Sequence, residues 1–396
     1  MISQRRKYQL ALLQIEQYDT KRYLEKRQGN ENQDLVRRMK WTGRMRLTAK
    51  LSALLGVVGA NILIGGIVRM VEKLVWRWVR GRLQGLRNNG LRVVGIVGSY
   101  GKTSVKHNAY EILRTKYRVV STPESYNTVL GIAKCLYWEV DDKTEIFLVE
   151  MGAYQRGDIA ELARMVQPDV GVLTGIARQH LERFGSYENI KKAKGEIAEY
   201  MQENGGKLVA NGSDEVVREV VEKIINKRVW YEGDGREEIN LNGGRKIARV
   251  VGMSKKSIMQ AKIRPVRSRF EMTTDRYGMR VIDDSYSSND RGFSDAVRHL
   301  GKQKEYYRIL VTPGLVELGR ESKQIHEKLG KEIMGNADMV ILVGKNERTR
   351  GLERGIAGKV KIIYIKKTME FIQIIKKMKL DKEPLVLLEN DVPENY

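Results

Sequence analysis

The residues best suited to chemistry lie in one short stretch, 93–105, with the sequence VVGIVGSYGKTSV. Apolar, β-favouring residues lead into a glycine-rich turn that closes with Gly101, Lys102, Thr103 and Ser104. Such a loop holds a polyphosphate because its glycines let backbone N–H groups turn inward, and the helix that follows adds its N-terminal dipole. Lys102 is then placed to reach the terminal phosphates, and the Thr103 hydroxyl to bind Mg²⁺. The sequence therefore predicts a nucleoside triphosphate site.

The spacing of this loop departs from the strict phosphate-loop pattern. Ile96 takes the place of the first glycine, while Gly98, followed by Ser99, falls inside the loop. A Gly-Lys-Thr triplet alone also fits an ordinary glycine turn with a solvated lysine. The β-type run before it and the helical pattern after it favour the phosphate loop.

Three residues further along could complete a site, although each also has an ordinary structural interpretation. Glu150 ends the apolar run EIFLVE and could face the phosphate loop, or it could be a cap or a solvated strand tip. His180 follows GVLTGIA and could ligate a divalent metal, although a lone histidine is more often satisfied or exposed. Lys194 lies in NIKKAKGEIAEY, where the simpler interpretation is a solvated basic face with Glu188 and Lys192 paired.

The composition narrows the class of protein. The 396 residues carry a net charge of +23 and a single cysteine, Cys135, which excludes an internal disulfide framework and fits a reducing compartment. Residues 1–92 hold 20 Lys and Arg against 6 Asp and Glu, so this part of the chain seeks an anionic partner. The basic excess adjoins an apolar segment, and no nucleic-acid-binding motif is present. We therefore expect no nucleic acid partner.

The N-terminal segment has a membrane-like pattern. Residues 51–68 carry no charge, which at about 1.5 Å per residue is just long enough for a bilayer core. Both flanks are basic, and in 71–83 the side chains of Trp76 and Trp78 alternate with cations, as in helices that lie at a membrane interface. We expect a cytoplasmic protein at the inner face of the cell membrane, on an anionic surface, with residues 84–91 as a linker. A buried helix of a soluble bundle is the alternative.

From Arg92 onward, apolar β-type runs alternate with helical patterns, which predicts an α/β fold with parallel sheets covered on both faces. The expected domains are a basic helical, membrane-associated segment (1–91), a central domain (92–265) and a smaller C-terminal α/β domain (266–396). The expected strands lie at 93–98, 117–121, 145–150, 170–174 and 207–210, and then near 279–282, 308–311, 339–343, 361–364 and 385–388.

Six motifs together resemble one known family. GIVGSYGKTS, TPESYNTVLGIA, VEMGAYQRGDI, HLERFGSYENIKKAKGEI, SRFEM and DDSYSSND are similar, in order and spacing, to the ATP-dependent Mur ligases of peptidoglycan synthesis. The resemblance is greatest to the branch that adds D-alanyl-D-alanine. It covers about residues 93–345 and implies a central P-loop parallel-sheet ATPase domain followed by a Rossmann-like C-terminal domain. Residues 1–90 do not resemble the family's domain for the uridine nucleotide.

The resemblance also implies roles for single residues. Lys102 and Thr103 would serve the ATP phosphates and Mg²⁺. Glu150 would ligate that ion, and His180 a second one. Lys194 resembles the family's carbamylated lysine, in which CO₂ converts the amine into an anionic metal ligand.

Further positions match the family's nucleotide and substrate contacts. Asn127 resembles the central Asn near the phosphates and substrate, and Arg269 resembles an Arg that contacts ATP from the hinge between domains. Asp284 and Asn289 fall where the C-terminal domain contributes to nucleotide and substrate binding. Asn211 resembles the Asn on the adenine side.

The implied reaction is activation of a carboxylate as an acyl phosphate by ATP, attack by an amine, and release of ADP and phosphate. The expected partners are a UDP-muramoyl-peptide or a lipid-linked precursor, together with an amino acid or dipeptide. Two alternatives remain open. One is a ligase of the same superfamily for a non-wall substrate, such as a folylpolyglutamate-like or polymer-forming enzyme; the other is a catalytically silent membrane scaffold.

Overall fold

The structure is a computed structural model, and it divides the chain into two compact units, Met1–Arg77 with Val392–Tyr396, and Trp78–Asp391. It describes residues 9–10, 12–14, 18, 23, 42–123, 126–264, 272–274, 278–285 and 289–390. The expected nucleotide contact Arg269 lies outside these residues.

A long helix, α4 (Gly43–Asn88), dominates the first unit and runs on into the second. Gly56 has non-helical angles (φ 67°, ψ 169°), so α4 consists of two helical segments joined at a kink. In the first unit, one face of α4 packs through Met45, Ala49 and Val57 against a small cluster that includes Leu10.

The other face of α4 is exposed and apolar. Leu54, Ile62 and Met70 are 84%, 57% and 60% exposed. Among the described residues, one helical stretch, Arg44–Asn88, is long and apolar enough to cross a membrane by length and composition. The linker expected at 84–91 is wrong in its first part, because α4 continues to Asn88. Leu86 is buried there, and that burial outweighs the turn-forming tendency of the nearby Gly and Asn residues.

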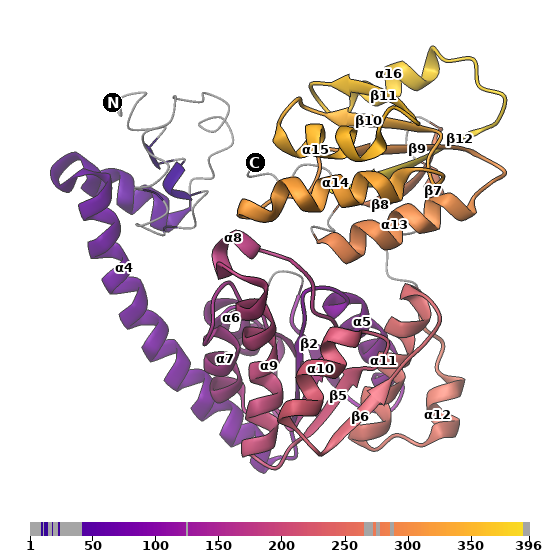
Figure 1. The fold of residues 1–396 in the computed structure, drawn as a ribbon. Helices are drawn as coiled ribbons and strands as arrows, with labels where there is room; N and C mark the ends of the chain where they lie inside the picture. The colour runs from indigo at the N-terminus through magenta and orange to yellow at the C-terminus, as the bar shows by residue number, and fades with distance from the viewer. Residues whose placement is uncertain are drawn as a thin grey trace. The chain divides into compact units, whose positions relative to one another are not determined.

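The central domain is built on a six-stranded parallel sheet of order β2-β3-β1-β4-β5-β6. Its strands are β1 (Arg92–Val97), β2 (Val119–Ser121), β3 (Ile146–Glu150), β4 (Val170–Leu173), β5 (Lys207–Asn211) and β6 (Arg228–Tyr231). Its helices are α5 (Lys102–Leu113), α6 (Val129–Glu139), α7 (Asp158–Val166), α8 (Leu181–Phe184), α9 (Tyr187–Glu203), α10 (Glu215–Ile224), α11 (Arg236–Val251) and α12 (Lys255–Gln260). Helices α5 and α11 cover one face of the sheet, and α7, α9 and α10 cover the other (Figure 1).

The sequence assigned no element to the end of this domain, where β6, α11 and α12 form. Gly243 and Gly244 lower the helix propensity of α11, yet they allow it to pack closely on α5. A Cβ on Gly244 would lie 2.8 Å from the backbone nitrogen of Ala109. The glycines are therefore packing residues within a helix rather than breakers of one.

The C-terminal domain has a second six-stranded sheet of order β11-β10-β9-β12-β8-β7, in which only the pair β7–β8 is antiparallel. Its strands are β7 (Met272–Thr274), β8 (Arg280–Asp284), β9 (Tyr307–Thr312), β10 (Met339–Val343), β11 (Lys361–Ile365) and β12 (Pro384–Glu389). Its helices are α13 (Asp290–Lys302), η1 (Gly319–Glu321), α14 (Ser322–Ile333), α15 (Glu347–Ile356) and α16 (Glu370–Lys376). The expected fold class, two α/β domains preceded by a helical segment, is confirmed.

Candidate functional site

The phosphate-loop stretch forms the turn between β1 and α5. Gly101 adopts φ 78°, which favours glycine, and a Cβ on Gly98 would lie 2.1 Å from the Thr174 hydroxyl oxygen. The Lys102 ammonium donates to the carbonyl oxygen of Gly98 at 2.8 Å, so its side chain folds back over the loop. Ser99 is buried and donates to the Ala177 carbonyl at 3.2 Å. The loop leads into the N-terminus of α5, whose first-turn N–H groups and dipole suit an anion.

Glu150 ends β3, the strand next to β1, and lies at the expected edge of the sheet. Its Oε2 accepts a hydrogen bond from the Thr103 hydroxyl at 3.3 Å and lies 3.0 Å from the Lys106 ammonium. Burial alone would raise the pKa of Glu150, but the positive charges of Lys102 and Lys106 outweigh it and lower the pKa. Glu150 is therefore an ionised carboxylate beside a hydroxyl, a donor pair that suits Mg²⁺.

Lys194 lies on the inner face of α9 and is only 4% exposed. Burial, helped by the charge of Lys102, lowers its pKa to about 7, against the opposing influence of nearby carboxylates that include Glu150. The solvated-face interpretation is therefore wrong for this residue. On that helix Glu188 pairs with Lys191 at 2.5 Å. A lysine that is substantially neutral near pH 7 is nucleophilic enough to add CO₂.

His180 precedes α8 in a left-handed conformation (φ 56°). Its Nδ1 contacts the carboxylate of Glu317, from the loop after β9, and Glu317 also lies 2.7 Å from Arg183. Burial is the main cause that lowers the pKa of His180, and the cations Arg183 and Lys194 add to it, while Glu317 opposes it. With Nδ1 occupied by Glu317, a neutral His180 keeps Nε2 for another partner.

These groups act on one another electrostatically. Lys102 shifts the pKa of both Glu150 and Lys194, and Lys194 in turn shifts that of His180. Within the described residues, no three His, Cys, Asp or Glu side chains come together as a metal site. Glu150 with Thr103 offers oxygen donors to one ion.

Asn127 lies next to the carboxyl end of β3. Its carbonyl accepts from the Gly152 backbone N–H at 2.9 Å, and a Cβ on Gly152 would lie 2.8 Å from the Asn127 amide carbon. The glycine of the MGA motif therefore makes room for the Asn127 side chain. Ser104, in the first turn of α5, is half-buried.

The other candidate residues have different positions. Asn211 ends β5, donates to the Thr174 carbonyl at 2.9 Å and lines the cavity described below. Asn289 is buried and caps α13 by accepting from the Gly292 N–H at 2.8 Å. This contact is a helix cap, and the expected role of Asn289 in nucleotide or substrate binding stays a prediction.

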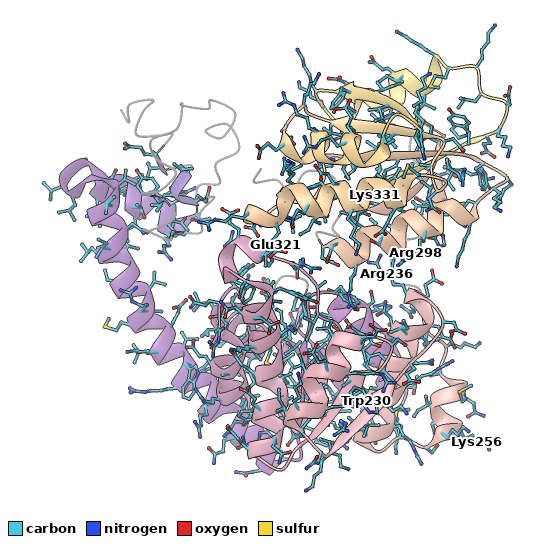
Figure 2. The ribbon with its side chains drawn as sticks, viewed as in Figure 1. Trp230, Arg236, Lys256, Arg298, Glu321 and Lys331 are labelled. Atoms are coloured by element: carbon cyan, nitrogen blue, oxygen red, sulfur yellow. The ribbon has the colours of Figure 1, made fainter. Side chains whose placement is uncertain are left out.

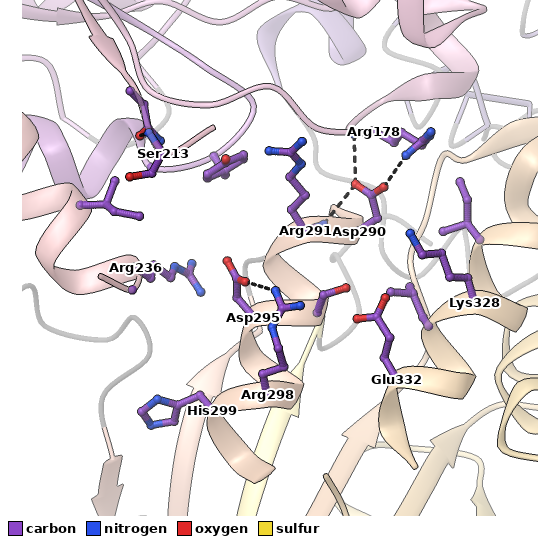
Figure 3. Close-up of a pocket in the computed structure, with 18 of the residues that line it drawn as sticks. Arg178, Ser213, Arg236, Asp290, Arg291, Asp295, Arg298, His299, Lys328 and Glu332 are labelled. Atoms are coloured by element: carbon purple, nitrogen blue, oxygen red, sulfur yellow. Dashed lines mark hydrogen bonds and ion pairs between the residues drawn. The ribbon is translucent and has the colours of Figure 1, made fainter. Parts of the chain in front are cut away.

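A cavity of about 830 Å³ adjoins the phosphate loop. Tyr100, Gly101, Asn211 and Ser213 of the central domain contribute to its wall, together with residues of α13 and α14. Figure 3 shows cationic side chains on several of its sides. The cationic residues labelled there are Arg178, Arg236, Arg291, Arg298 and Lys328, and Lys302 also lines the cavity. Arg236 and Arg298 are also labelled in Figure 2. Asp290, Asp295, Glu321 and Glu332 also line the cavity, so its wall is of mixed charge and suits an elongated polar molecule.

Several residues at this cavity had no signal in the sequence analysis. The Tyr100 hydroxyl donates to Asp214 at 2.6 Å, and Arg291 of α13 lies 2.6 Å from the same carboxylate. Arg178 pairs with Asp290 at 2.9 Å in the same manner. Each bridge joins residues about 75 or more positions apart, so only the folded chain reveals it. Together these contacts hold α13 against Tyr100, Arg178 and Asp214 of the central domain.

Asp284, the remaining candidate, is part of a buried charge cluster. Arg236 donates to both of its carboxylate oxygens, at 2.9 and 3.2 Å. Glu389 is paired in register with Asp284 on the adjacent strand and is 0% exposed. In the described part of the chain, no donor reaches either oxygen of Glu389. Burial raises its pKa well above the ordinary value, and the nearby Asp284 carboxylate raises it further, against the opposing charge of Arg236.

We expect Glu389→Gln to stabilise the protein at neutral pH. A carboxyl whose folded pKa is raised costs stability as the pH rises above its unfolded pKa, about 4.3, and the amide removes that cost. The melting temperature at pH 7.5 should rise by about 3 °C, and the gain should vanish near pH 3, where the carboxyl is protonated in both the folded and the unfolded state. Thermal unfolding of both proteins at the two pH values measures this. An unchanged or lower melting temperature at pH 7.5 would contradict the buried, protonated state of Glu389.

Two models of one family match the chain, one for each α/β domain. Residues 96–269 match the Mur ligase middle domain, and residues 268–389 match the Mur ligase glutamate ligase domain. The chain belongs to the Mur ligase family.

Within the family, the chain is similar to ligases that share one name. It is 38% identical over 120 residues to UDP-N-acetylmuramoyl-tripeptide--D-alanyl-D-alanine ligase of Bacillus subtilis (30% of this chain, 26% of the relative). It is 27% identical over 316 residues to the same-named ligase of Mycobacterium bovis (67% and 61%). Its fold superposes on the MurF ligase of Thermotoga maritima in complex with ADP, with a TM-score of 0.70 and 24% identity (81% and 80% covered). The chain thus spans 26% and 61% of the lengths of these two curated relatives.

Proposed function

We propose that this protein is an ATP-dependent amide ligase that adds D-alanyl-D-alanine to the tripeptide of a UDP-muramoyl precursor in the cytoplasm. The observation that carries the proposal is the convergence of Lys102, Thr103, Glu150 and Lys194 beneath the glycine loop. The relatives' names supply the substrates. The folylpolyglutamate-like alternative and the silent scaffold have no observation of their own in their favour.

The chain's residues support the chemistry as follows. The substrate carboxylate must approach the γ-phosphate of ATP although both are negative, so the site has to offset their repulsion. Lys102 and the loop N–H groups offset part of it, and divalent ions held by Thr103 and Glu150, and by His180 and a carbamylated Lys194, would supply further positive charge. In this proposal Asn127 would orient the substrate near the phosphates, and the cavity lined by Asn211 and Arg236 would take the nucleoside.

Transfer of the γ-phosphoryl group to the carboxylate gives an acyl phosphate and ADP. The incoming amine then attacks the acyl carbon and phosphate leaves, so the amide forms without loss of the activated acid to water. The bridges Tyr100–Asp214–Arg291 and Arg178–Asp290 hold α13 over the loop and thereby limit access of water.

The test is ADP release by the purified full chain with ATP, Mg²⁺, the UDP-muramoyl tripeptide and D-alanyl-D-alanine. Release that requires both acceptor and dipeptide, with the joined product detected by mass spectrometry, is the expected result. Turnover only with glutamate and a folate acceptor would assign the protein to the alternative ligase class. No turnover with any muramoyl peptide and amine would overturn the proposal.

We also propose that α4 attaches this ligase to the inner face of the membrane by lying in the interface. After the kink at Gly56 only the 12 residues 57–68 are uncharged, whereas a span needs about 20. The helix carries nine Lys and Arg and one acidic residue, Glu72, which favours an anionic surface. A lipid-linked muramoyl peptide is then a second candidate acceptor. A lower KM for that acceptor on vesicles than for the soluble precursor supports it, and equal values in both forms contradict it.

A further inference from the structure

An exposed aromatic cluster lies on the catalytic unit, away from the phosphate loop. Tyr137 and Trp138, at the end of α6, are 65% and 70% exposed, and Trp78 of α4 is 42% exposed. Their rings contact one another: Trp78 and Tyr137 have centroids 6.0 Å apart, and Tyr137 and Trp138 meet edge to face at 4.9 Å. Three large aromatic rings gathered at the surface mark an interaction site rather than scattered exposure.

The cluster unites two elements that are remote in sequence. In this part of α4, Val79, Leu83 and Leu86 face inward and are 0–2% exposed. That packing fixes the helix on the central domain and turns Trp78 outward, toward α6. The aromatic surface is therefore part of the second compact unit, Trp78–Asp391.

The surrounding charges favour an anionic partner. On α4, Arg77 and Arg80 are exposed, and Lys134 is exposed on α6, one turn before the cluster. The nearby acidic residues Asp142 and Asp141 are paired, with Arg82 at 3.2 Å and Arg118 at 3.0 Å. Glu139 is exposed beside Trp138 and is the local exception.

We propose that Trp78, Tyr137 and Trp138 form a membrane-docking surface, which places the catalytic domain directly against an anionic bilayer. This rests on the proposed attachment through α4 and extends it from the helix to the enzyme body. Tyr and Trp rings partition into the headgroup layer because one part of each is apolar and another can hydrogen-bond, and the flanking cations bind anionic lipids. A contact with a second copy of the protein would not require the cations Arg77, Arg80 and Lys134 around the aromatic rings.

The position of the docking surface would determine how far the active site lies from the membrane. Helix α6 starts directly after Asn127, with Thr128 as its N-cap, and ends at the aromatic cluster. Nine helical steps of about 1.5 Å lead from Val129 to Trp138, and two extended steps of about 3.5 Å precede them, so Asn127 lies within about 20 Å of Trp138. An acceptor peptide carried on a membrane-anchored sugar diphosphate can reach that height.

The test compares the full chain with Tyr137→Ala/Trp138→Ala in flotation with phosphatidylcholine vesicles, with and without phosphatidylglycerol. We expect the wild type to float with the anionic vesicles, and the double variant to bind them about tenfold more weakly because two rings no longer leave water. Met259→Ala, which truncates a 60% exposed side chain on α12, is the matched control and should bind like the wild type. Activity on the soluble acceptor should be equal in all three.

A second readout reports on the surface itself. Lipids with brominated acyl chains should quench part of the tryptophan emission, and Trp138→Phe should remove some of the quenching. Trp230→Phe should not, since β6 lies at the far edge of the sheet from β2, the strand that precedes α6. Wild-type flotation with undiminished binding by the double variant, or unaltered quenching in Trp138→Phe, would overturn the docking surface while leaving attachment through α4 intact.

Two other outcomes are also decisive. If the wild type does not float, attachment and docking surface both fall, whereas ADP release with the soluble acceptor would still support the ligase. If the wild type self-associates without lipid and the double variant does not, the surface is a contact between copies and the bilayer proposal is overturned.

Discussion

Lys194→Ala is expected to lower kcat by about three orders of magnitude while the fold is retained. The amine is buried, its pKa is lowered to about 7, and it lies within electrostatic reach of Lys102, Glu150 and His180. A carbamate there would convert a cation into the anionic donor that a second metal ion needs. Steady-state ADP release gives kcat, and circular dichroism checks the fold.

The dependence of the activity on pH and on CO₂ tests whether Lys194 carries a carbamate. Below pH 7 protonation of the Lys194 amine competes with the addition of CO₂, so activity should fall, and added bicarbonate should restore it more strongly at pH 6.5 than at pH 8. Labelled CO₂ should give a carbamate carbon signal in the wild type that Lys194→Ala lacks. Lys192→Ala, which changes an exposed lysine on the same helix, should retain full activity and the signal. An active, signal-free wild type would exclude the carbamate.

Lys102→Ala should also abolish turnover, by about a thousandfold, for a different reason. Its ammonium folds over the phosphate loop and holds down the pKa of Glu150, so its loss removes charge that would neutralise the γ-phosphate. The loss should appear in kcat with ATP, and ATP binding measured by calorimetry should also weaken. Lys116→Ala, at an exposed lysine just after α5, is the matched control.

The same variant separates a ligase from a scaffold. In a catalytically silent protein, replacing Lys102 would change neither growth nor localisation in a complementation assay. In a ligase it should behave like a deletion. Full complementation by Lys102→Ala would therefore contradict the proposed function, whatever the nucleotide affinity.

Much of the fold could be predicted because its strands are buried on both faces. The run 146–150 is fully buried and hydrophobic, so its position and its terminal Glu150 followed directly from the sequence. The expected roles of Glu150, His180 and Lys194 stay predictions, but their burial and mutual electrostatic influence agree with them.

Other features were beyond sequence reasoning for physical reasons. Strand β6 has four residues, mostly half-exposed at the sheet edge, so it lacks a clear apolar pattern. Helix α11 contains two adjacent glycines that allow its close packing on α5. Helix propensity, which is a local property of the sequence, does not reflect this packing. The partners Arg291 and Glu317 come from the other domain, and only the tertiary fold brings them to Asp214 and His180.

The contact between His180 and Glu317 has a thermodynamic consequence. Because a C-terminal-domain carboxylate holds Nδ1, the position of that domain determines whether His180 presents a well-oriented Nε2 to a metal ion. Ion affinity and interdomain geometry are then linked reciprocally: whatever stabilises one favours the other by the same free energy. A displacement of the C-terminal domain that separates Glu317 from His180 would thereby weaken the binding of any metal ion at Nε2.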